Sequence, residues 1–136
     1  MVEYLTKGYE MARVHKAKRV VGGEVVETKI KSMCSANIIE VEVGANGFRG
    51  GKYSYGSRTF FQIRDESQTV MWCEVVNLDF DFDVDIMDSP GAKSVSIPFA
   101  GDTELLTFID ALKFAVSVLE KQAGEKNIQK FRYGKL

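Results

Sequence analysis

One stretch of the chain combines glycines, cations and aromatic rings in a way that suits an anionic ligand. Between residues 44 and 56, five of thirteen residues are glycine, which argues against a regular helix or strand there. Charged and aromatic side chains lie among these glycines or just after them: Arg49, Lys52, Tyr53, Tyr55 and Arg58. Backbone amides freed by glycine can converge on an anion, cations add charge, and tyrosines can stack on a base or a sugar. The stretch therefore predicts a cradle for a nucleotide or another phosphate-bearing small molecule.

The same stretch departs from both standard nucleotide-binding patterns. Tyr53 follows Gly51 and Lys52 at the place where a P-loop needs Ser or Thr. No helical pattern follows the glycines, as a dinucleotide-binding turn would require. A long flexible connection between two strands is the competing interpretation, and the sequence leaves both open.

A second candidate is the strictly alternating segment at residues 78–87. Its carboxylates occupy every second position: Asp79, Asp81, Asp83 and Asp85. Strand geometry places them on one face at intervals of about 6.8 Å. That spacing is too wide for one hard cation without further oxygen ligands from loops. The face is either solvated or a surface for a protein partner, including a second copy of the chain.

Catalysis and metal binding find little support in the residue types. His15 is the only histidine, and the two cysteines, Cys34 and Cys73, are far apart and belong to no metal-binding motif. No nucleophile paired with a base and no cofactor motif is visible. We expect no enzyme, no metal site and no cofactor, and we expect both thiols to be reduced.

The apolar pattern predicts the elements that position these candidates. Residues 18–21 and 24–30 form a β-hairpin around Gly22 and Gly23, with Lys18 opposite Glu27. Further strands are expected at residues 36–43, 59–63, 69–76, 78–87 and 94–99, with a turn at 65–68. Apolar residues then recur at helical spacing over residues 102–122, behind Asp102 as the N-cap candidate.

The predicted fold class is α+β. An antiparallel sheet of four to five strands carries one long C-terminal helix packed on one face, preceded by an N-terminal β-hairpin arm. The chain of 136 residues divides into an arm and hairpin at 1–31, a core domain at 32–124 and a basic tail at 125–136. Phe131 and Tyr133 are the expected anchors of this tail.

Charge is strongly segregated along the chain, although the net charge is only −1. Residues 1–39, 40–64, 65–110 and 111–136 carry net charges of +3, +2, −10 and +4. Opposed blocks of this kind favour either closure within one chain or head-to-tail association with another copy, and of the two we expect a homo-oligomer. A pI near 5.9 argues against a dedicated nucleic-acid binder. The absence of a long apolar segment and of a leader pattern predicts a cytoplasmic protein with no membrane partner.

Two segments carry a resemblance to known sequences. Residues 32–51 read SMCSANIIEVEVG followed by the glycine-rich turn, and residues 101–119 begin GDTELLTFIDALKFA. Together they resemble a group of small uncharacterised proteins encoded by phages and prophages, over residues 32–120. The resemblance leaves the N-terminal hairpin outside. It implies a viral accessory protein in the host cytoplasm and supplies no catalytic residue.

Two functional hypotheses from different classes follow. In the first, the protein is a non-enzymatic binder that holds a phosphate-bearing small molecule in the glycine-rich loop. In a phage, such a binder would sequester a host nucleotide signal. In the second, the protein is an interaction module that uses its acidic strand, either as an inhibitor of a host defence protein or as a self-assembling structural protein.

Overall fold

The computed structural model describes residues 13–52, 54–78 and 92–134. Several sequence predictions fall outside these residues. They are the N-terminal arm at residues 1–12, Tyr53 of the glycine-rich loop, and the acidic set Asp79, Asp81, Asp83 and Asp85. What the sequence predicts for these residues is therefore not tested by the structure.

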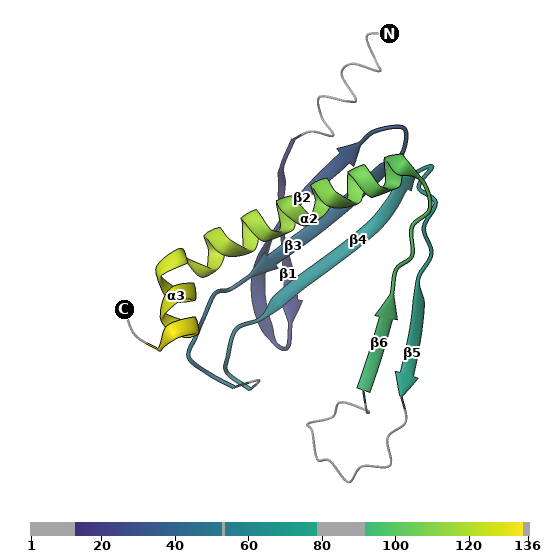
Figure 1. Ribbon diagram of the computed structural model, residues 1–136. Coiled ribbons are helices and arrows are strands. Elements are labelled where there is room, and N and C mark those ends of the chain that lie inside the picture. Colours follow the sequence, from purple (N-terminus) through teal and green to yellow (C-terminus); the bar gives the residue numbers. More distant parts are fainter. Residues whose placement is uncertain (1–12, 53, 79–91, 135–136) are drawn as a thin grey trace.

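The predicted α+β class is confirmed (Figure 1). Four strands form an antiparallel sheet in chain order, β1 (His15–Val21), β2 (Glu24–Cys34), β3 (Ile38–Ala45) and β4 (Thr59–Ser67). A separate two-stranded ribbon is formed by β5 (Glu74–Leu78) and β6 (Ala92–Ser96). The long helix α2 (Asp102–Ala123) packs on the four-stranded sheet, and a short helix, α3 (Glu125–Tyr133), follows it.

The N-terminal hairpin forms as predicted. Gly22 and Gly23 both adopt positive φ, 53° and 82°, which a two-residue hairpin turn of this type requires. The predicted pairing of Lys18 with Glu27 is present. The second strand then continues beyond the hairpin, because residues 29–34 pair with β3. The domain boundary expected after residue 31 thus falls within β2, an inner strand of the sheet.

Helix α2 lies across β2 and β3 and buries only a narrow stripe of its surface (Figure 1). Two contact clusters join it to the sheet. The first contains Met33, Val41 and Ala111, and the second contains Val43, Ala115 and Val118. These residues are at most 8% exposed and form the apolar core of the molecule. The α2 residues Ala111, Ala115 and Val118 recur at intervals of four and three, which is the spacing of one helix face.

The start of α2 differs from the prediction. The N-cap is Gly101, and Asp102 is the first helical residue and makes no capping hydrogen bond. Glu104 anchors this end instead, because its carboxylate accepts hydrogen bonds from the Val70 N–H at 3.1 Å and the Thr103 hydroxyl at 2.9 Å. The bond from Val70 is the main reason that the pKa of Glu104 lies below its usual value. This contact ties the helix to the segment that leads into β5.

The face of the sheet away from α2 has a polar centre. Val41 and Val43 face the helix, so Glu42 points to the opposite side, where it is 3% exposed. Arg19 of β1 forms a bidentate ion pair with it, at 2.6 and 2.8 Å, and the Thr28 hydroxyl donates a further bond at 2.6 Å. The Arg19 guanidinium also lies 4.9 Å from the ring centre of Phe60 in β4. The sheet therefore curls enough for residues of its two outer strands to meet over this face.

Two boundaries between residues 65 and 76 were predicted wrongly. The expected turn at 65–68 is mostly strand, because Asp65 and Ser67 pair with β3 across a register shift between Ile38 and Ile39. The expected strand at 69–76 begins only at Glu74. Thr69 is buried and hydrogen-bonded to the side chain of Asn37 at 3.0 Å, which holds this connection against the end of the sheet.

Candidate functional site

The glycine-rich connection between β3 and β4 is closed at its base by Asn46. The Asn46 N–H donates to the Arg58 carbonyl at 3.1 Å, and the Asn46 side-chain oxygen accepts from the Arg58 N–H at 2.7 Å. The Asn46 amide also donates to Glu24 of the β1–β2 hairpin at 2.9 Å. Gly47 and Gly50 adopt φ values of 83° and 70°, so the chain bends where glycine has no steric cost. The loop thus has a defined base.

Arg58 shapes the loop. Its guanidinium donates to carbonyl oxygens of the loop and of the hairpin turn at 3.0 to 3.5 Å: Gly22, Ser54, Gly56 and Ser57. A phosphate approaching this side chain would compete with those carbonyls. The structure therefore gives Arg58 a part in holding the loop against the hairpin, a role that the spacing of residues did not indicate.

The other predicted loop residues that the structure describes, Arg49, Lys52 and Tyr55, are exposed. Arg49 and Lys52 are exposed and form no ion pair with any residue that the structure describes. The ring of Tyr55, which is 60% exposed, lies against Gly51, where a side chain would collide with it. A tight turn from Lys52 to Gly56 sets the position of this ring, through bonds of 3.0 and 2.5 Å to the Lys52 carbonyl.

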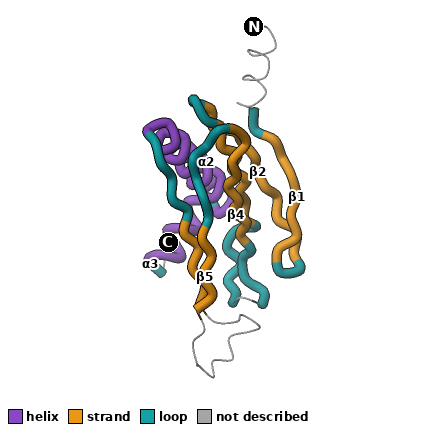
Figure 2. Tube along the Cα trace, turned by 90° about the vertical axis from the view of Figure 1, so that its right-hand side faces the viewer, coloured by secondary structure: helices purple, strands orange, loops and turns teal. Residues whose placement is uncertain are grey.

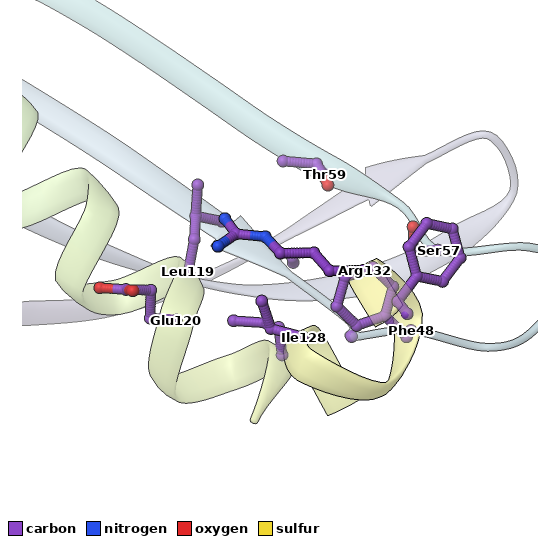
Figure 3. Close-up of a pocket in the computed structure, with 11 residues that line it drawn as sticks. Phe48, Ser57, Thr59, Leu119, Glu120, Ile128 and Arg132 are labelled. Carbon is purple, nitrogen blue, oxygen red and sulfur yellow. The ribbon is translucent and has the colours of Figure 1, made fainter. Parts of the chain in front are cut away.

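A pocket of about 390 Å³ lies beside the base of the loop. Its walls come from the start and end of the loop, the adjoining strand ends, the C-terminal turn of α2, and α3 (Figure 3). The lining residues are Ala45, Gly47, Phe48, Ser57, Thr59, Leu119, Glu120, Ala123, Ile128, Phe131 and Arg132. The volume lies within the range of small-molecule sites, and the lining is mostly apolar with a few polar groups, as such sites usually are.

Arg132 is the cation of this pocket. Figure 3 shows its side chain extending from α3 into the pocket, between Thr59 of β4 and Leu119 of α2. Glu120 also lines the pocket, but its carboxylate points away from the guanidinium in the same view. Within the described part of the chain, Arg132 takes part in no ion pair or hydrogen bond. Arg132 is exposed, so its guanidinium donors are open to solvent and to an anion that enters the pocket.

An aromatic pair joins the loop to α3. The rings of Phe48 and Phe131 are stacked, with centroids 5.0 Å apart and an angle of 16° between their planes. Both rings stay accessible, since Phe48 is 44% and Phe131 is 72% exposed. Gln122 fixes the neighbouring end of α2, because its amide accepts from the Ala45 N–H at 2.8 Å and donates to the Glu27 carbonyl at 2.9 Å. The pocket therefore has firm walls in the sheet and in α2, and an aromatic side at the loop.

The pocket residues on α3 were not assigned to the loop site, because residues 125–136 were interpreted as a basic tail. A helical pattern is visible in retrospect, since Phe131 and Arg132 follow Ile128 by three and four residues. Phe131, one of the two expected anchors of this segment, stacks on Phe48 but is 72% exposed. Tyr133, the second expected anchor, is 71% exposed.

Features of a metal site or of a membrane-spanning helix are absent from the residues that the structure describes. These residues contain no group of three or more His, Cys, Asp or Glu side chains that could hold a metal ion. None of their helices combines the length and the apolar character needed to cross a membrane. No protein-family model matches the chain, and no curated protein or solved structure matches it either.

Proposed function

We propose that the protein is a non-enzymatic binder of a small anionic molecule, which it holds in the pocket between the glycine-rich loop, α2 and α3. The observation that carries this proposal is the guanidinium of Arg132, which pairs with no residue that the structure describes and extends into a pocket of about 390 Å³ with a largely apolar lining. An apolar wall accommodates a ring or chain, and the guanidinium can donate two parallel hydrogen bonds to a phosphate or carboxylate.

A phosphate-bearing molecule with an aromatic ring fits this chemistry best. The hydroxyls of Ser57 and Thr59 line the pocket on the sheet side and can bond phosphate or sugar oxygens. The accessible ring of Phe131 offers a stacking surface for a base. Arg49 and Lys52 add positive charge in the loop that begins at the pocket.

The biological use that we propose for this binder rests on the resemblance to phage and prophage proteins. In an infected cell, a protein that binds a nucleotide without altering it lowers the free concentration of that nucleotide. Sequestration of a host nucleotide signal is therefore the role we propose. It requires a tight complex and an amount of protein comparable to that of the signal.

The test is native mass spectrometry of the protein purified from the cells that produce it, followed by identification of any released small molecule. Binding of adenosine monophosphate and of inorganic phosphate is then measured by calorimetry. Arg132→Met is expected to weaken binding of the nucleotide at least tenfold, because it removes the bidentate cation and keeps the apolar stem. Lys130→Met is the matched control, since it removes a cation from the same helix outside the pocket lining.

Two outcomes would count against the pocket. If the Arg132→Met variant and the wild type bound the nucleotide with equal affinity, Arg132 would not be part of the binding site. If Arg49→Ala and Lys52→Ala abolished binding while Arg132→Met did not, the ligand would lie on the exposed loop, as the sequence first indicated. A protein that carries no small molecule and binds neither probe would overturn the proposed function.

A further inference from the structure

The β5–β6 ribbon packs on no other helix or strand among the described residues. Its two strands pair with each other, and neither makes a contact with any other helix or strand that the structure describes. The ribbon and the segment leading into it expose large apolar side chains, from 46% to 65% of each: Val70, Trp72, Val75, Val76 and Val95. A two-stranded ribbon in this state is marginally stable in water. It needs a partner surface to be persistently ordered.

A second uncovered apolar surface lies on the outer side of α2. Leu105, Ile109, Leu112 and Val116 recur at intervals of four, three and four, so they form one stripe along the helix. They are 39% to 58% exposed, and Leu106 beside them is 51% exposed. A shallow depression runs along the C-terminal half of this stripe, beside Leu112 and Val116. We call these five residues the α2 stripe.

The two surfaces match in length. The five residues of each ribbon strand span about 17 Å at the usual rise of a strand. The α2 stripe spans about 17 Å from Leu105 to Val116 at the rise of an α-helix. A flat two-stranded ribbon laid on one face of a helix is also an ordinary way for these elements to pack in two-layer folds.

The exposed areas agree with the needs of a dimer. Val75 pairs with Val95, so these two valines share one face of the ribbon and Val76 lies on the other. Taking about 150 Å² for a fully accessible side chain of this size, that face exposes roughly 190 Å² of apolar side chain and the α2 stripe exposes roughly 360 Å². If each copy gives its ribbon to the other and receives the other's ribbon on its helix, each copy buries roughly 550 Å², and the total of about 1,100 Å² exceeds the roughly 1,000 Å² that a specific interface needs. Covering only one of the two surfaces would leave the other exposed.

We propose that two copies of this chain form a two-fold dimer in which the β5–β6 ribbon of each copy packs on the α2 stripe of the other. This arrangement covers both apolar surfaces with a single kind of contact. It lies on a different part of the molecule from the pocket beside the glycine-rich loop, so it is independent of the proposed ligand.

Sedimentation velocity on the full chain tests the proposal with two complementary double variants. The ribbon variant carries Val75→Asp and Val95→Lys, and the stripe variant carries Leu105→Glu and Val116→Glu. Val75 and Val95 are cross-strand partners, so the opposite charges keep the strand pairing favourable while they remove the apolar surface. All four residues are at least half exposed, so the fold is expected to survive, which circular dichroism checks. The control variant carries Val20→Asp and Val25→Lys, at paired valines of the β1–β2 hairpin that are 74% and 58% exposed.

The wild type and the control are expected to sediment at twice the 15.2 kDa mass of the chain, and each double variant as a monomer. An equimolar mixture of the two double variants is expected to recover a dimer, because one intact ribbon can still pack on one intact stripe. Its dissociation constant should exceed that of the wild type at least tenfold, since one of two contacts is lost.

Each alternative occupant gives a different result. If α2 packed on α2, the ribbon variant would stay dimeric; if ribbon packed on ribbon, the stripe variant would. Either result overturns the proposal, and so does a mixture that stays monomeric. A wild type that is monomeric at 100 µM, roughly the upper range of such measurements, also overturns it and assigns both surfaces to a partner of another kind.

Discussion

The four-stranded sheet and the β5–β6 ribbon are both antiparallel and both rich in valine, yet their valines have opposite surroundings. In the sheet, Val41 and Val43, which face α2, are fully buried. In the ribbon, Val75 and Val95 are 65% and 62% exposed. The difference lies in what each element packs on, because α2 covers the sheet and no described element covers the ribbon (Figure 2). Valine at alternate positions indicates a strand, but it does not show whether the covering surface belongs to the same chain.

The first prediction compares the same truncation in the two regions. Val41→Ala is expected to lower the free energy of unfolding by about 2 kcal/mol, because it leaves a cavity between β3 and Ala111 of α2. Val75→Ala is expected to change it by less than about 0.5 kcal/mol when the protein is dilute enough to be monomeric. Urea unfolding of both variants, followed by circular dichroism, measures these values. Equal losses would mean that the ribbon is buried within its own chain, which would remove the distinction between the two regions.

The second prediction concerns the polar face of the same sheet. The pKa of Glu42 lies below its usual value, chiefly because Arg19 donates to the carboxylate, with a further contribution from Thr28. A carboxylate whose pKa is lowered by folding stabilises the fold above its unfolded pKa of about 4.3. That contribution is lost as the pH falls through the folded value.

Glu42→Gln removes this charge and is expected to cost about 1 kcal/mol at pH 7, less than breaking a fully buried pair because Arg19 is partly exposed. The difference from the wild type should shrink as the pH is lowered from 5 towards 3. Urea unfolding at pH 7, 5, 4 and 3 gives the comparison. A difference that stays constant over this range would show that the ion pair does not contribute through its charge.

The sheet and the long helix were predictable from the sequence because their signals are local. Gly22 and Gly23 fix the hairpin turn and its register, and apolar spacing at 3.6 residues extends without a break from residue 102 to 122. The N-cap was misplaced because Glu104 bonds the Val70 N–H, a partner 34 residues away in the chain that spacing alone does not reveal. The turn expected at residues 65–68 was wrong for a similar reason, because Asp65 and Ser67 pair with β3, whose residues are more than 20 positions earlier in the chain.

The candidate site was less predictable. Gly47, Phe48 and Ser57 of the glycine-rich loop line the pocket, but none of the described residues predicted to bind the ligand does: Arg49, Lys52, Tyr55 and Arg58. The loop's most prominent cation, Arg58, bonds its carbonyl groups, because glycine-rich backbone leaves acceptors as well as donors to satisfy. The cation that reaches into the pocket, Arg132, comes from a helix about 75 residues further along, and only the folding of α3 onto α2 brings it there.

The smallest expected effect tests α3, which is covered more than the ribbon and less than the sheet. Phe131 and Tyr133 lie on this helix with nearly the same exposure, 72% and 71%, but only Phe131 stacks on another ring, that of Phe48. Phe131→Ala is therefore expected to cost about 0.5 to 1 kcal/mol of local stability, the usual contribution of an exposed aromatic pair. Hydrogen exchange of the α3 amides should speed up about two- to fivefold, while exchange in β3 stays unchanged. Tyr133→Ala is the matched control and should leave both rates as they are. If the two variants speed exchange equally, the stacked pair does not hold α3 in place, and the pocket wall that includes Arg132 depends on the helix contact with α2 alone.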